Sequence, residues 1–322
     1  MTRIDLVQGE LLVAIGDIHG AHDALENLLA ALHHDLGLFT DATAHQLRPG
    51  ARLVFTGDYI DRGPDSRRVL ARLMEMKQAS GAHLSLLRGN HELMALAALG
   101  ELVDATISNS PSERLRAVRR FHSHTTHGIN GGDQLIGEWA IEGDEPDAFI
   151  EACARYLEEM RRDGPLGAFI RNLDLFSIQE VHGRRFLFSH GDIPRDLQSG
   201  EKLRREWQDF EDSRDRGTAG DWSVKYGGDS PGARWMWGRG FSSFRNGRDS
   251  TSEVRDICER SAVDYIVAGH TPTDGEIAVY GGRIFHVDVG MVLGRAPRAL
   301  VVDAHGIHSF GPGHERPLVT FD

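Results

Sequence analysis

Three short apolar runs stand out in the first 90 residues. They cover residues 11–15, 52–56 and 83–87, and each is followed by a turn that contains glycine. Short apolar runs that end at turn residues are typical of buried β-strands. We therefore expect three strands in the N-terminal part of the chain.

Apolar residues at helical spacing fill the gaps between these runs. They recur between 25 and 32 and again between 69 and 74, which predicts a helix in each gap. The second helix follows Pro64, and either Asp65 or Ser66 is expected to cap its start. A β-α-β-α-β order indicates a parallel sheet with helices packed on it.

The rest of the chain divides at about residue 172. From about 100 to 172 strand signals are missing and charged helical segments are predicted, including one at 112–122. We interpret this stretch as a helical insertion into a single domain spanning residues 1–322. The elements expected after it are paired strands over 175–181 and 184–189, a helix over 251–262, a buried strand over 264–268 and antiparallel strands beyond 276.

Polar motifs rich in glycine follow five of the predicted strands. They are Gly16-Asp17-Ile18-His19-Gly20, Gly57-Asp58-Tyr59-Ile60-Asp61-Arg62-Gly63, Gly89-Asn90-His91-Glu92, Ser189-His190-Gly191-Asp192 and Gly269-His270-Thr271. Ligands bind at the carboxyl ends of the strands in an open α/β sheet, so we expect the motifs to converge on one rim. Carboxylate, amide and imidazole donors without thiolates suit Mn, Fe or Zn, which favours a catalytic pair of divalent ions over a structural zinc.

Composition narrows the class of protein. The 48 acidic residues outnumber the 36 Lys and Arg residues, giving a net charge of −12, a poor match for nucleic acid. No stretch reaches the roughly 20 apolar residues of a membrane span, and residues 1–10 lack the apolar core of a secretory signal. Cys153 and Cys258 are the only cysteines and form no CxxC pair, so we expect a cytoplasmic protein without nucleic-acid or membrane partners.

In order, the motifs GDIHG, GDYIDRG and GNHE, a later His-Gly and a later Gly-His resemble those of the PPP metallophosphatases, within the calcineurin-like phosphoesterase superfamily. The resemblance runs from Leu11 to about Gly290. The segment from Trp235 to Phe241 resembles the bacterial Shewanella-like phosphatases most. This resemblance implies an α/β fold, a sandwich of two mixed β-sheets flanked by helices.

The resemblance also implies a role for each motif residue. The expected ligands of two divalent ions are Asp17, His19, Asp58, Asn90, His190 and His270, with Asp58 bridging the ions. Mn²⁺ is expected, with Fe or Zn as alternatives. His91 is the expected general acid, oriented by Asp61, and a water between the ions attacks phosphorus. The expected substrate-binding residues are Arg62, Arg239 and Asn90.

These roles imply a metal-dependent phosphomonoesterase, a protein phosphatase acting on phosphoserine, phosphothreonine or phosphotyrosine. The alternatives are a symmetrical dinucleoside tetraphosphate hydrolase or another small-molecule phosphoesterase, a nucleic-acid phosphodiesterase, and a metal-stabilised binding module without activity. The Asp61-Arg62 pair weighs against the tetraphosphate hydrolase, and the acidic composition weighs against the nuclease. Asp192 stands where relatives often have a second glycine after His-Gly, and Glu276 stands where eukaryotic relatives have a tyrosine, so the substrate preference of the eukaryotic relatives is not carried over to this chain.

Several polar residues receive structural roles instead. Glu92 is interpreted as a favourable charge at a helix start, Asp192 as a turn residue, and Trp235 and Trp237 as packing or rim residues. His286 lies on a predicted strand. We assign it a structural role, and the alternative is that it contacts and orients residues of the site. The histidines without a surrounding motif are assigned to the surface or core: His33, His34, His122, His124, His127 and His182.

Overall fold

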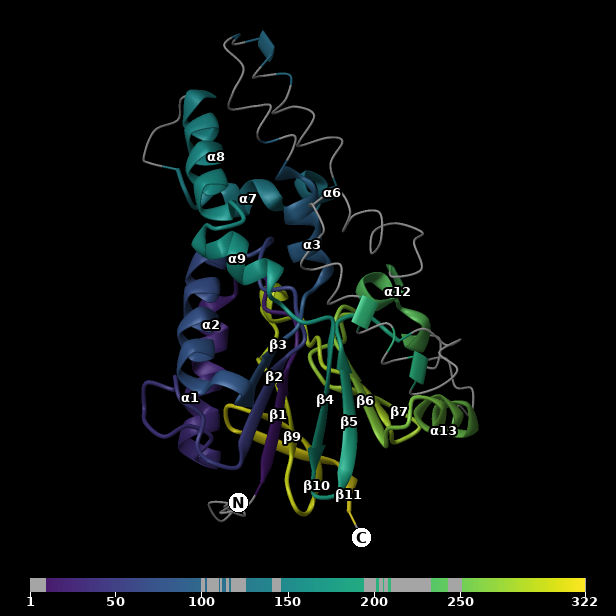
Figure 1. The fold of residues 1–322 in the computed structure, drawn as a ribbon. Coiled ribbons are helices and arrows are strands. Elements are labelled where there is room, and N and C mark those ends of the chain that lie inside the picture. The colour runs from purple at the N-terminus through teal and green to yellow at the C-terminus, as the bar shows by residue number, and fades with distance from the viewer. Residues whose placement is uncertain are drawn as a thin grey trace.

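The computed structural model describes residues 10–99, 126–140, 146–193, 233–242 and 251–321, with ten isolated positions between these ranges. These parts of the chain form two mixed β-sheets with helices around them (Figure 1). The expected α/β sandwich is therefore confirmed. Each helix in the described part of the chain is too short or too polar to cross a lipid bilayer.

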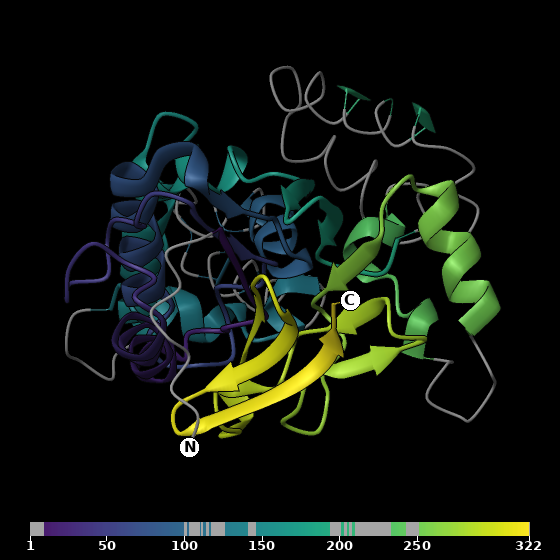
Figure 2. The same ribbon diagram turned by 90° about the horizontal axis from the view of Figure 1, so that it is seen from below.

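The first sheet has the order β11-β10-β9-β1-β2-β3. Its strands are β1 (Leu11–Ile15), β2 (Ala51–Phe55), β3 (Leu84–Leu86), β9 (Ala299–Val302), β10 (Gly306–Gly311) and β11 (His314–Thr320). Strands β1, β2 and β3 run parallel and are connected by α1 (His22–Leu36) and α2 (Ser66–Ser80), as the sequence predicts. The three C-terminal strands add to β1 in antiparallel order. The last two, β10 and β11, form the long yellow hairpin at the front of Figure 2.

The second sheet has the order β4-β5-β6-β8-β7. Its strands are β4 (Phe176–Val181), β5 (Arg184–Ser189), β6 (Tyr265–Ala268), β7 (Ala278–Tyr280) and β8 (Ile284–His286). The expected pairing of β4 with β5 is antiparallel, whereas β5, β6 and β8 run parallel. The parallel pairing of β8 with β6 differs from the antiparallel strands expected beyond residue 276. Strand β8 pairs with β6 as well as with its antiparallel hairpin partner β7.

Alternation along the strands of the second sheet produces two apolar layers. Phe188, Val267 and Phe285 belong to the large core that also contains β1 and its neighbours. The residues next to them, Leu187 and Ile266, belong to a smaller core. Successive side chains of a strand point to opposite faces, so one face packs on the first sheet. The other packs on α13 (Thr251–Arg260), seen at the outer edge of Figure 1.

Six helices of the described structure cover one end of the sandwich. They are α3 (Asn90–Ala97), α6 (Thr126–Ile129), α7 (Gly132–Gly137), α8 (Pro146–Met160), α9 (Pro165–Arg171) and α12 (Ala233–Trp237). Two 3-10 turns, η1 (Gly81–His83) and η3 (Met291–Leu293), complete the described elements. The described parts of the expected insertion are helical, whereas most of 112–122 lies outside the described residues. The single-domain assignment stays a prediction.

The N-terminus of α2 is capped by a residue far away in the sequence. Asp65 occupies the N-cap position, but its side chain makes no capping hydrogen bond within the described structure. Instead, Glu138 at the end of α7 accepts hydrogen bonds from the backbone N–H groups of Ser66 (2.8 Å) and Arg67 (2.7 Å). The expected N-cap position of Asp65 is confirmed, but its side chain does not cap the helix, because a carboxylate from the helical insertion already pairs these donors.

We expect Glu138→Ala to lower the free energy of unfolding by about 1–2 kcal/mol, because two helix N–H groups lose their acceptor. Asp65→Ala is the matched control and should change the free energy by less than about 0.5 kcal/mol. Urea denaturation followed by circular dichroism measures both. Equal losses in the two variants would contradict the cap from Glu138.

Candidate metal centre

The loops after five strands bring the six expected metal ligands into one buried region. These residues are at most 5% exposed: Asp17, His19, Asp58, Asn90, His190 and His270. Strands β1, β2 and β3 of the first sheet and strands β5 and β6 of the second lead into their loops. The expected convergence on one rim is confirmed, and both sheets contribute to it.

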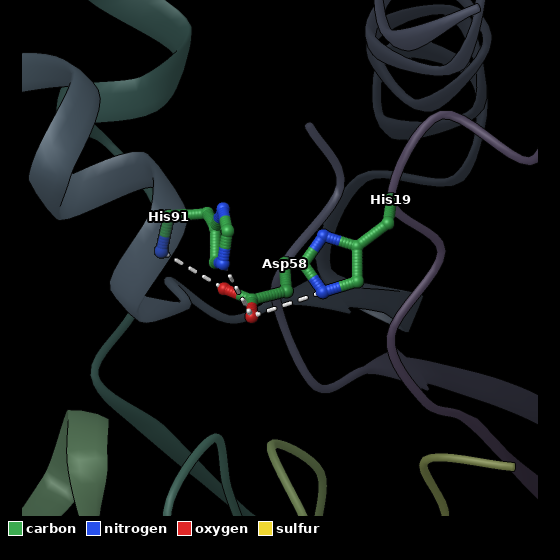
Figure 3. A group of neighbouring side chains, drawn as sticks. All are labelled: His19, Asp58 and His91. Atoms are coloured by element: carbon green, nitrogen blue, oxygen red, sulfur yellow. Dashed lines mark hydrogen bonds and ion pairs between the residues drawn. The ribbon is translucent and has the colours of Figure 1, made fainter. Parts of the chain in front are cut away.

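Asp58, His19 and His91 form the first cluster of potential metal ligands (Figure 3). One ligand atom from each residue lies within 4.8 Å of the others. Asp58 Oδ2 is 3.5 Å from His19 Nε2 and 3.9 Å from His91 Nε2. The two imidazoles approach the carboxylate from different elements, α3 and the loop after β1.

Asp58, His190 and His270 form the second cluster of potential metal ligands. His190 Nε2 lies 3.4 Å from Asp58 Oδ1 and 2.9 Å from Asn90 Oδ1. Asp58 thus belongs to both clusters and directs one carboxylate oxygen to each. This is the arrangement that a ligand bridging two adjacent ions requires.

The histidines present lone pairs toward the centre. His19 Nδ1 donates to the carbonyl of Ile60 (2.8 Å), and His190 Nδ1 donates to that of Thr56 (2.9 Å). In a neutral imidazole the other nitrogen, Nε2, is then an acceptor and a potential ligand. His270 Nε2 is buried and has no hydrogen-bond partner among the described residues.

The electrostatics agree with a cation site. Burial lowers the pKa of His19 to about 3 and that of His270 to about 2, so both rings are neutral at pH 7. Burial alone raises the pKa of Asp58, but the surrounding histidines outweigh it and lower that pKa below its ordinary value. A buried carboxylate among imidazole lone pairs has the donor set of a divalent transition metal. The residues therefore fit two such ions.

Asp17 lies beside this centre but in neither cluster of the described residues. Its Oδ1 accepts a hydrogen bond from the backbone N–H of His270 at 3.0 Å. Burial, followed by the neighbouring charge of Asp288, raises the pKa of Asp17 well above its ordinary value. Its expected role as a ligand of the first metal stays a prediction.

His91 and Asp61 form the expected pair. His91 Nδ1 donates to Asp61 Oδ2 at 2.7 Å, and both side chains are fully buried. Burial lowers the pKa of His91, but Asp58 and Asp61 outweigh it and the pKa is raised. The other ring nitrogen, Nε2, faces the guanidinium of Arg62 at 3.0 Å, and the same guanidinium lies 2.7 Å from His19 Nε2.

Strained backbone concentrates at the centre. Eight non-glycine residues in the described structure have positive φ. Five of them belong to the expected site: His19, Asp58, Asp61, Arg62 and His270. Left-handed backbone costs about 1–3 kcal/mol per non-glycine residue and persists only where surrounding contacts enforce it.

Glu92 is one source of this enforcement. Its carboxylate accepts hydrogen bonds from the N–H groups of Asp58 (3.0 Å) and Tyr59 (2.8 Å), and from Gly89 in the capping box of α3. Burial and then the charge of Asp58 raise the pKa of Glu92 to about 7. Its expected helix-terminal role is correct but incomplete, because Glu92 also holds the loop that carries Asp58.

Gly89 is needed for the same contact. A Cβ at this position would overlap the backbone N and the carboxylate of Asp58. A hydrogen bond from the N–H of His91 to Asp58 Oδ1 (3.0 Å) also depends on this close approach. Gly89 of the Gly89-Asn90-His91-Glu92 motif is therefore required for the packing of Asp58.

Arg239 is exposed and lies near His190 and His270 of the second cluster, on a loop that Asp192 supports. Asp192 accepts hydrogen bonds from His286 Nε2 (2.8 Å) and from the backbone N–H of Phe241. Its own N–H donates to the carbonyl of Gly238 at 3.0 Å. Asp192 is therefore more than the expected turn residue, because it holds the loop that carries Arg239. His286 supports the site through Asp192, which is the alternative to its purely structural role.

One contact of the centre has no signal in the sequence. His127, in α6, is fully buried and lies 3.0 Å from Asp61 Oδ1 through its Nε2. The sequence assigned it to the surface or core because no motif surrounds it. Only the folded insertion brings it to a residue 66 positions away.

Comparisons with known proteins bear on the fold and on the family. A cold-active protein-tyrosine phosphatase of a psychrophilic Shewanella species has the same fold, with a TM-score of 0.60 and 22% identity, over 97% of this chain and 81% of that one. An uncharacterized protein of Schizosaccharomyces pombe is 26% identical over 291 residues, 87% of this chain and 73% of that protein.

A shorter similarity is found to the symmetrical bis(5'-nucleosyl)-tetraphosphatase of Delftia acidovorans. It is 39% identical over 87 residues, 27% of this chain and 25% of that enzyme. The family model described as calcineurin-like phosphoesterase matches residues 11–274, which include the centre described above. The chain therefore belongs to the calcineurin-like phosphoesterase family.

Proposed function

We propose that the protein is a metal-dependent phosphomonoesterase that hydrolyses phosphorylated side chains of proteins, on serine, threonine or tyrosine. The observation that carries this proposal is the carboxylate of Asp58, shared by two buried clusters beside the His91–Asp61 pair. The fold shared with a protein-tyrosine phosphatase supports it.

The ions would be held on either side of Asp58. His19, from the first cluster, and Asp17, which lies beside it, would serve the first ion. The second would be held by the remaining ligands, Asn90, His190 and His270. When bound, two divalent ions supply positive charge for the phosphoryl oxygens and a water of lowered pKa as nucleophile. Mn²⁺ is the ion we propose, and Fe or Zn fit the same donors.

The chain's own residues then bind the phosphate and move a proton. Arg62 lies at His19 and His91 of the first cluster. Arg239 lies near His190 and His270 of the second. Each guanidinium can hold phosphate oxygens through paired N–H groups. As the phosphorus–oxygen bond to the leaving group breaks, His91 Nε2 gives its proton to that oxygen. Asp61 keeps His91 Nδ1 protonated and the ring oriented.

A second candidate is hydrolysis of symmetrical dinucleoside tetraphosphates. The similarity to the Delftia enzyme favours it, although that similarity covers only 27% of this chain. Both reactions use the same kind of centre, so the substrate decides between them.

A substrate panel with added Mn²⁺ tests the proposal. It contains p-nitrophenyl phosphate, bis-p-nitrophenyl phosphate, phosphoserine, phosphothreonine and phosphotyrosine peptides, and diadenosine tetraphosphate. We expect the highest kcat/KM on phosphomonoesters. A preference for the tetraphosphate would favour the second candidate, and a preference for the diester would overturn both.

We expect His91→Asn to lower kcat by about 10²–10⁴-fold while both metals stay bound, because general acid catalysis contributes on this scale. Metal content is measured by inductively coupled plasma mass spectrometry on the purified variant. Loss of a metal together with activity would show that His91, which lies in the first cluster, is a ligand rather than the acid.

We expect Asp58→Asn to lose at least one metal as well as activity, because a neutral amide cannot bridge two cations as a carboxylate does. Asp303→Asn is the matched control: Asp303 is also a buried aspartate, in the turn between β9 and β10, away from the centre. Full metal content in Asp58→Asn would contradict the bridging role.

A further inference from the structure

The carboxylate of Asp61 is held between two imidazoles. Oδ2 lies 2.7 Å from His91 Nδ1, and Oδ1 lies 3.0 Å from His127 Nε2. All three side chains are fully buried. Burial raises the pKa of Asp61, but His127 and His91 outweigh it and hold the pKa at about 2. An ionised carboxylate only accepts hydrogen bonds, so both imidazoles donate to it.

The ring of His127 is packed against a bare stretch of backbone. A Cβ built on Gly132, the first residue of α7, would lie 2.5 Å from Nε2 and 2.5 Å from Cδ2 of the His127 ring. Gly132 is not among the glycines with positive φ. Glycine is therefore needed at this position to leave room for the His127 ring, and not to allow an unusual backbone conformation.

The same segment contacts the Asp61 loop at two further points. A Cβ on Gly131 would lie 3.2 Å from the backbone N of Arg62. Glu138, at the end of α7, caps α2 through Ser66 and Arg67. Residues 127–138 thus contact the segment 61–67 at several points. Among these contacts, His127 is the one that touches the His91–Asp61 pair, through Asp61.

We propose that His127 is a positioning residue for leaving-group protonation, and that α6 and α7 thereby set the orientation of Asp61. This inference rests on the proposed phosphomonoesterase function. With one donor on each oxygen, the plane of the Asp61 carboxylate is fixed, and Oδ2 stays in line with His91 Nδ1. Without His127, the buried and charged Oδ1 of Asp61 loses its hydrogen-bond donor. The carboxylate then rotates or binds water, and the ring of His91 is no longer held in one orientation.

This role predicts a dependence on the leaving group. A poor leaving group needs its proton in the transition state, whereas a good one departs with little help. Loss of His127 should therefore slow phenyl phosphate more than p-nitrophenyl phosphate. A loss of stability or of metal would slow both equally.

The experiment measures kcat and KM for a series of aryl phosphates with wild type, His127→Leu and His127→Gln. We expect His127→Leu to lower kcat for phenyl phosphate by about 10–100-fold, with a smaller loss for p-nitrophenyl phosphate, and with KM and metal content unchanged. His127→Gln keeps an N–H donor on a side chain of similar reach and should recover most of the lost rate.

A second pair of variants leaves His127 itself in place. Gly132→Ala should displace the imidazole and reproduce the dependence on the leaving group. Gly137→Ala, in the same helix, is the control, because no described atom lies within 4 Å of its Cβ. This pair also provides the test if His127→Leu fails to fold.

A double-mutant cycle with Asp61→Asn completes the test. Because His127 acts through Asp61, we expect His127→Leu to add no further dependence on the leaving group in that background. Equal losses for all leaving groups, or additive effects in the cycle, would overturn the inference while leaving the proposed function intact. Wild type without phosphomonoesterase activity would instead overturn the proposed function.

Discussion

One buried carboxylate, that of Asp58, imposes most of the local structure around it. It is 1% exposed and lies close to a second carboxylate, Asp17. Placing negative charge in a protein interior is costly unless donors or cations compensate for it. The N–H of His91 donates to Asp58, and the imidazoles of both clusters surround its carboxylate. A pair of cations would complete the compensation.

The same demand explains the arrangement of the sheets. Asp58 follows β2 of the first sheet, whereas His190 and His270 follow β5 and β6 of the second. The two sheets must therefore keep their relative position for the two clusters to share Asp58. The large apolar core, which contains Phe188 and Val267 together with β1 and β2, provides that rigidity. Packing far from the centre thus sets the distances within it.

The helical insertion contributes to the centre as well as covering it. Its described helices α6 and α7 reach the loop after β2 through His127 and Glu138. That loop carries Asp61 and Arg62, both with left-handed backbone. Strained segments keep their conformation only when several contacts enforce it, and here the contacts come from the insertion as well as from the sheet.

The sequence by itself determined the strands of the first sheet, the helices between them, and the motifs that end in the centre. Local signals suffice for these features: apolar runs, helical spacing, and glycines next to Asp, Asn and His. The motif order also indicated the family, because Asp58, Asn90 and His270 each follow a predicted strand.

Only the tertiary structure decided the contacts between segments that no short motif connects. The parallel pairing of β6 with β8, the cap of α2 by Glu138, the support of the Arg239 loop by Asp192, and the contact of His127 with Asp61 are of this kind. Each depends on where a distant segment lies after the core has packed. A lone histidine or glutamate looks the same in the sequence whether it faces solvent or a buried charge, because its partner is chosen by the fold and not by its neighbours along the chain.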